Sequence, residues 1–200
     1  MHSSAANTLL SSLVGMGEIN SNPVLQVIDG LDSISKEVKY PKGLLQFQGG
    51  DWQAFYHCHS NTNDIQHLFD NEHGHFHIFA KVAEDKDEWS HIVALSMNNM
   101  GQPLRWFMVN HWVTAGVWLE ANLLSRKLDG IAYSKQDTLL TKWLLSMLGI
   151  YKNELSGMLN KRDQAIESAD QASFHQNKQH YLLAEQSIYL EQKLQSIAKN

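Results

Sequence analysis

The chain of 200 residues is 43% hydrophobic and 18% charged, a composition that suits a folded domain with a core and excludes a disordered chain. Its net charge of −5, with basic residues scattered along the chain, argues against nucleic acid and anionic membrane surfaces as partners. The single cysteine, Cys58, excludes an internal disulfide and a zinc site built from cysteines.

Neither a secretory signal nor a membrane span is indicated. Residues 1–17 lack a basic segment followed by a long apolar stretch. The most apolar run, residues 139–150, is interrupted by Thr141, Lys142 and Trp143 and is shorter than the ~20 apolar residues that a membrane helix requires. We therefore expect a cytoplasmic protein.

The N-terminal part of the chain has the spacing of helices. Asn22 followed by Pro23 is typical of an N-cap and a first helical residue. Apolar residues then recur at helical spacing, which predicts an amphipathic helix over residues 22–38 that ends before Pro41. A shorter helix is expected over residues 8–14, and Gly15 and Gly17 would end it.

From about residue 44 the apolar pattern alternates with a period of two. Four segments rich in aromatic and branched residues are predicted to be strands: residues 52–59, 73–82, 91–97 and 104–113. The turn residues at 98–103 predict that the last two strands form an antiparallel hairpin. The long polar loop over 60–72 leaves the pairing of the first two strands open.

Helical spacing returns after residue 114. Residues 134–137 resemble a capping box and open a helix whose apolar side extends to Met158. Residues 181–197 predict a second C-terminal helix, and the polar segment 161–179 between them is an exposed helix or a linker.

This order of elements predicts an α+β fold with an antiparallel sheet of about four or more strands, flanked by N-terminal and C-terminal helices. We expect a single α+β domain with a histidine-rich sheet over residues 1–160. Residues 161–200 are expected to form a polar, Gln-rich helical extension. The C-terminal helices are predicted to cover the sheet or to join two copies of the chain as a homo-oligomer.

The composition is unusual in its eleven histidines, and five of them lie in the first two predicted strands. Alternation along a strand sends every second side chain to the same face. The first strand therefore places two histidines on one face, and the second places three there, opposite Phe76, Ile78 and Ala80. If the strands are neighbours, these five imidazoles converge; they are His57, His59, His73, His75 and His77.

Such a cluster is costly without a ligand, because neighbouring imidazoles resist protonation and burying them neutral leaves hydrogen bonds unmade. A divalent cation binds neutral imidazole and removes both problems. His91, at the start of the third strand, is a further ligand or a residue that orients one. The alternative is a solvated polar face on which histidine is simply tolerated.

Carboxylates close to the cluster in the sequence are Glu72, Asp64 and Asp70. Glu72 is our candidate general base, because it neighbours His73 and belongs to a loop that can bend it inward. We predict a pocket wall at Asn110 and His111, of which alternation lets only one face the site.

Two resemblances support a site of this kind. His57-Cys58-His59 followed by Asp64 resembles the first cupin motif, whose histidines and carboxylate bind iron or another divalent metal. A cupin has Glu where Asp64 stands and a Pro-Gly turn that this chain lacks.

The strings that start at Tyr56 (Tyr-His-Cys-His), Glu72 (Glu-His-Gly-His-Phe-His), His91 and Asn110 together resemble an uncharacterised bacterial domain family. This resemblance implies a shared site without naming its chemistry.

The leading hypothesis is a metalloenzyme with a histidine-rich iron, zinc, copper or nickel centre and a small-molecule substrate. Iron or copper would make it an oxidoreductase, and zinc a hydrolase. The alternatives are a non-catalytic metal carrier, buffer or sensor; a haem-binding protein with walls formed by Phe79, Trp106 and Trp112; and an interaction module built on the C-terminal helices.

Overall fold

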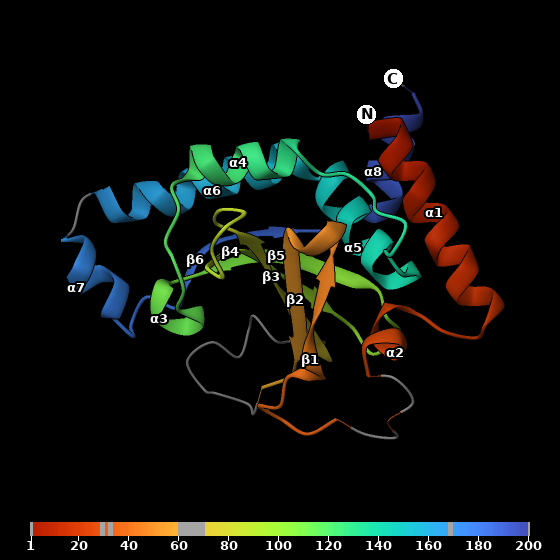
Figure 1. Ribbon diagram of the computed structural model, residues 1–200, viewed down its shortest axis with the longest axis horizontal. Coiled ribbons are helices and arrows are strands. Elements are labelled where there is room, and N and C mark those ends of the chain that lie inside the picture. The colour runs from red at the N-terminus through yellow and green to blue at the C-terminus, as the bar shows by residue number, and fades with distance from the viewer. Residues whose placement is uncertain (1, 29–30, 32–33, 60–70, 168–169, 200) are drawn as a thin grey trace.

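The structure is a computed structural model that describes residues 2–28, 31, 34–59, 71–167 and 170–199. It has an α+β fold in which an antiparallel sheet is covered on one face by helices (Figure 1). Among the described residues, no helix is long and apolar enough to cross a membrane.

The sheet is a meander in which each strand pairs with its neighbours in the chain order β1-β2-β3-β4-β5-β6, always antiparallel. Its strands are β1 (Tyr40–Phe47), β2 (Trp52–His57), β3 (Gly74–Lys81), β4 (Trp89–Met97), β5 (Pro103–Val109) and β6 (Leu182–Ser187). The predicted α+β class, antiparallel sheet and hairpin of β4 and β5 are confirmed. Strand β1 was not predicted as a separate element.

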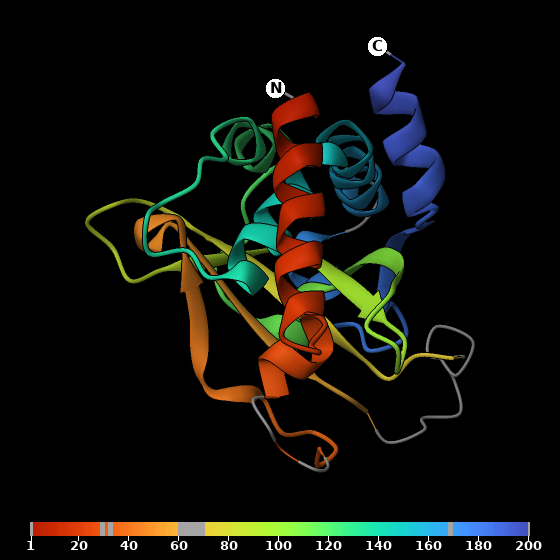
Figure 2. The same cartoon turned by 90° about the vertical axis from the view of Figure 1, so that its right-hand side faces the viewer.

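Helices lie before the sheet and after β5. They are α1 (His2–Glu18), α2 (Pro23–Ile28), α3 (His111–Thr114), α4 (Ala121–Asp129), α5 (Leu139–Ile150), α6 (Lys152–Glu167), α7 (Gln171–Gln176) and α8 (Leu190–Ala198), with a 3-10 turn η1 (Gln48–Gly50) between β1 and β2. Figure 2 shows α1 lying across α5. At Gly15 an added Cβ would lie 3.1 Å from the Leu139 side chain, so this glycine lets α1 approach α5 rather than ending α1 as predicted.

Two helix predictions are wrong. The helix predicted over 22–38 ends at Ile28, and Glu37 has a left-handed backbone (φ 62°) that no helix contains. The segment Leu182–Ser187 is a strand instead of the start of a helix, although Leu, Ala, Glu and Gln favour helices. Pairing with the free edge of β5 outweighs that local preference.

Strand β6 lies inside the segment 161–200 that was predicted to be a helical extension, so this segment completes the sheet as well as contributing helices. Helix α8 follows β6, and its apolar stripe of Leu190, Leu194 and Ile197 packs partly buried against the main core. That stripe is therefore covered within the chain.

The two faces of the sheet differ in chemistry. The helix-covered face carries the main core, where Tyr56, Phe76, Ile78 and Ala80 are fully buried. The opposite face, which we call the histidine face, carries a small apolar cluster of Ala94, Phe107 and Val109 beside the histidines. The sheet thus separates the hydrophobic core from the polar cluster.

Gly74, the first residue of β3, is needed for the close approach of β2. A Cβ at this position would lie 2.6 Å from the His57 carbonyl oxygen and 2.7 Å from the Tyr56 hydroxyl. Tyr56 is fully buried and cannot move aside freely. Only glycine leaves room for both groups.

We expect Gly74→Ala to lower the free energy of unfolding by about 1–3 kcal/mol, because the new methyl group overpacks against backbone and a buried ring. Urea denaturation measures the change. The matched control is Gly157→Ala, at an exposed position inside α6 with nothing within 4 Å of an added Cβ. That variant should be about 1 kcal/mol more stable. Equal urea midpoints for Gly74→Ala and Gly157→Ala would contradict the conclusion that only glycine fits at position 74.

Candidate metal centre

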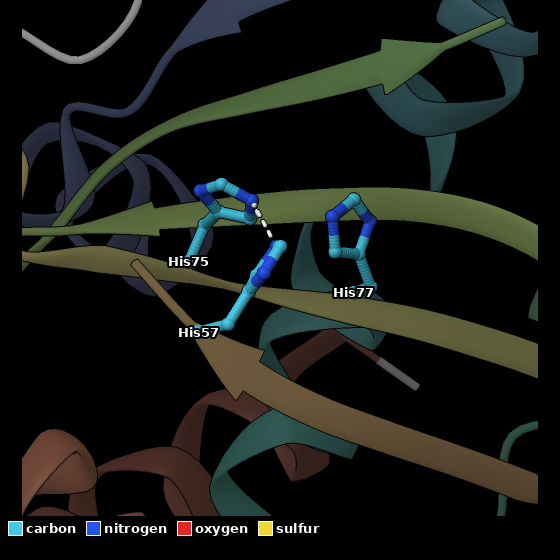
Figure 3. A group of neighbouring side chains, drawn as sticks. All are labelled: His57, His75 and His77. Atoms are coloured by element: carbon cyan, nitrogen blue, oxygen red, sulfur yellow. Dashed lines mark hydrogen bonds between the residues drawn. The ribbon is translucent and has the colours of Figure 1, made fainter. Parts of the chain in front are cut away.

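The pairing of β2 with β3 brings the histidines together. His57 is directly opposite His75, and Phe55 is opposite His77, so these side chains share the histidine face. Figure 3 shows His57, His75 and His77 lying close together on that face. His75 and His77 are 0% and 1% exposed, and His57 is partly buried.

One ring nitrogen from each of His57, His75 and His77 lies within 4.8 Å of the other two. We call this set the inner group. Three imidazoles in this arrangement can hold a metal ion. The structure thus shows a buried histidine cluster that can bind a metal ion.

A β-bulge adds His91 to the same face. Ile78 pairs with Val93 while the next residue, Phe79, pairs with His91, so Ile92 is the extra residue in β4. Without the bulge, alternation would turn His91 toward the helices. As a result, His91 Nε2 lies 3.0 Å from His77 Nδ1, where it can orient the His77 ring.

Glu72 contacts His75 at the ring nitrogen that points away from His57. Its Oε1 lies 2.6 Å from His75 Nδ1, and the Glu72 side chain is only 3% exposed. A carboxylate accepts the Nδ1–H, so in the neutral form of the His75 ring the lone pair is on Nε2. That atom lies 2.8 Å from His57 Nε2, whose N–H donates to it (Figure 3). An ion that replaces this shared proton would meet two nitrogen lone pairs.

His59 lies at the rim and contacts a residue that was not predicted. Its Nδ1 is 3.1 Å from Glu37 Oε2, and Glu37, His57 and His59 form a second set with ligand atoms within 4.8 Å of one another. We call this set the outer group. No sequence signal linked Glu37 to the site, because it lies in a segment that was predicted to be helical.

His73 lies apart from the other histidines. Its Nδ1 is 2.7 Å from the Tyr56 hydroxyl, and its ring stacks on the Tyr56 ring, on the helix-covered side. Strand β3 starts only at Gly74, so strand alternation does not apply to His73. The structure therefore brings five of the six predicted ligands to one face and places His73 elsewhere. Asp64 and Asp70 lie outside the described residues.

His57, His77 and His91 are held in their neutral forms. Burial, followed by the charges of His75 and His59, lowers the pKa of His57 to about 2. Burial and neighbouring histidines also lower the pKa of His77 well below its usual range. Burial, and then the positive charge of Arg162, lowers the pKa of His91 to about 3. Neutral imidazole is the form that binds metal ions.

Aromatic rings enclose the cluster. Phe55 lies 5.2 Å from His77, Phe79 lies 5.2 Å from His91, and Phe107 lies 5.1 Å from His75, measured between ring centroids. Tyr181 belongs to the same side and was missed, because it precedes a strand that was predicted to be a helix. Burial, followed by the negative charges of Glu72 and Glu37, raises the pKa of the Tyr181 hydroxyl.

Of the residues predicted as a pocket wall and as haem walls, His111 lines a small cavity together with His91, and Phe79 contacts the His91 ring. Asn110 caps α3 by accepting from the His111 N–H, and His111 packs against Trp118 and His175. Trp106 is fully buried in the main core on the helix-covered face, away from Phe79 on the histidine face. The predicted haem walls Phe79 and Trp106 therefore lie on opposite faces of the sheet.

The chain belongs to the family described as "Domain of unknown function (DUF6969)", which matches residues 3–188. The predicted membership of an uncharacterised family is thus confirmed, and the match spans both β6 and the histidine cluster. No curated protein and no solved structure matches the chain.

The lowered histidine pKa values predict that the metal-free protein is destabilised by acid. In the unfolded protein, each of these histidines takes up a proton as the pH falls below its ordinary pKa of 6.5. In the folded protein, the same histidine stays unprotonated until the pH reaches its lowered pKa. Each such histidine reduces the free energy of unfolding by about 1.4 kcal/mol per pH unit in that window.

Urea unfolding of chelator-treated protein from pH 7.5 to 5 measures the slope. His91→Gln should remove about 1.4 kcal/mol per pH unit from it. A free energy of unfolding that is constant over this range would contradict the neutral cluster.

Proposed function

We propose that this protein binds a divalent transition-metal ion through His57, His75 and His77, and that the ion is the centre of a metalloenzyme. The observation that carries the proposal is the approach of three imidazole nitrogens to within 4.8 Å on a face where two of the rings are fully buried. Nitrogen ligands at ~2.0–2.1 Å from one ion are about 3.3 Å apart in tetrahedral geometry. Small rotations of the three rings would bring the nitrogens from their present separations to this ligand spacing.

The residues behind the inner group support the proposal. Metal-binding histidines usually donate their second ring nitrogen to a carboxylate or another acceptor, which sets the tautomer and the ring orientation. Glu72 would do this for His75, and His91 for His77. Glu72 thus fits a positioning residue better than the general base we predicted, because its bonded oxygen faces His75 and its side chain is buried.

Three protein ligands leave a coordination position for water or a small-molecule substrate, as in catalytic rather than structural sites. Zinc would supply an activated water there, and iron or copper would supply redox chemistry. Imidazole ligands suit all of these ions, with iron and zinc our first candidates. Because imidazole ligands carry no negative charge, the inner group would leave the full charge of the ion to act on the ligand at the fourth position.

Metal analysis of purified, untagged protein should give close to one equivalent of a transition metal. We expect His75→Ala to lose the ion, and Glu72→Gln to weaken its affinity by about 10–100-fold while keeping the fold, because the amide holds His75 less strongly than a carboxylate.

Plasma mass spectrometry gives the content, and competition with a chelator gives the affinity. Glu84→Gln, an exposed position in the turn between β3 and β4, is the matched control and should bind normally. Protein that folds but takes up no metal after reconstitution would refute the proposal.

A metalloenzyme and a metal carrier differ in whether the fourth position is open. In the Co²⁺-substituted protein, added azide or cyanide should change the visible absorption spectrum, because a small anion can bind at the open position. A spectrum that does not respond to either anion would indicate a saturated site and favour the carrier.

A further inference from the structure

The outer group of Glu37, His57 and His59 shares one residue with the inner group. The two groups differ in exposure: the side chains of Glu37 and His59 are 56% and 21% exposed, whereas His75 and His77 are 0% and 1% exposed. His57 stands between them, partly buried, with its Nε2 directed at His75.

We propose that the outer group is the loading route of the metal centre: an ion is first captured by Glu37 and His59 and then passes through His57 to His75 and His77. This inference rests on the proposed function of the inner group. It assigns to Glu37 and His59 a kinetic role in place of permanent coordination.

Charge supports this route. In the described part of the chain, the carboxylate that contacts the inner group is Glu72, which is buried behind His75. The exposed Glu37 carboxylate puts a negative charge beside His59, at the exposed end of the described cluster. Charges placed at the mouth of a site raise association rates by roughly 10–10³-fold.

The backbone fixes Glu37 in this position. Its N–H donates to the Cys58 carbonyl at 2.9 Å, which ties the residue to the end of β2 between His57 and His59. Glu37 has a left-handed φ of 62°, a conformation that costs a non-glycine residue of order 1 kcal/mol or more. The carboxylate is thereby held beside His59 by the main chain.

The transfer is an exchange of ligands. Bonds from the ion to Glu37 and His59 break as bonds to His75 and His77 form, and no electron is transferred. The proton on His57 Nε2, which His75 accepts in the metal-free protein, moves through water to the other ring nitrogen. Because His57 belongs to both groups, the ion need not return to bulk water between them.

The test is stopped-flow mixing of metal-free protein with Co²⁺, followed by the visible absorption of the bound ion. We expect Glu37→Gln and His59→Asn to slow association about tenfold or more. Because a residue that only forms the route affects passage in both directions, dissociation into a chelator should slow by the same factor. The dissociation constant, the spectrum and the stoichiometry of one ion should stay unchanged, and Glu84→Gln should match the unaltered protein in every measurement.

Other outcomes overturn the inference in distinguishable ways. A weaker dissociation constant with an altered spectrum would make Glu37 or His59 a permanent ligand. Two Co²⁺ ions per chain would make the outer group a second resident site, and unchanged rates would remove it from the path. Failure of the unaltered protein to bind Co²⁺ would overturn the metal centre itself and the route with it.

Discussion

The register of β2 on β3 is the constraint on which the site depends. His57 faces His75 only in this alignment, and a slip of one residue would turn His75 and His77 into the helix-covered core. The register is held from the other face, where Tyr56 packs on Phe76, and from the end of the strand, where only glycine fits at position 74. Core packing on one face thus determines which nitrogens meet on the other.

The same alternation made much of the site predictable. Every second residue of a strand shares a face, so the sequence alone indicated that His75 and His77 lie together, opposite Phe76 and Ile78. It could not show that β2 and β3 are neighbours, because a long loop joins them. Turn chemistry was strong enough to predict only the hairpin of β4 and β5.

What the sequence did not show depends on departures from regular geometry and on contacts between distant segments. His73 lies one residue before its strand, and His91 reaches the histidine face through a bulge that leaves no simple pattern. Glu37 and Tyr181 lie far apart in the sequence, and they precede the edge strands β1 and β6. Edge strands take their conformation from pairing with a neighbour, which local propensity does not encode.

Among the described residues, the distribution of charge around the cluster supports the proposed metalloenzyme over a metal carrier. Burying several neutral imidazoles costs stability, and a site meant only to retain an ion would offset that cost best with carboxylates in direct contact with it. In the proposed centre the carboxylate of Glu72 would stand one imidazole away, where it would orient His75 without contacting the ion. An ion held by His57, His75 and His77 would keep its charge for the remaining ligand, the condition under which it polarises a bound water or substrate most strongly.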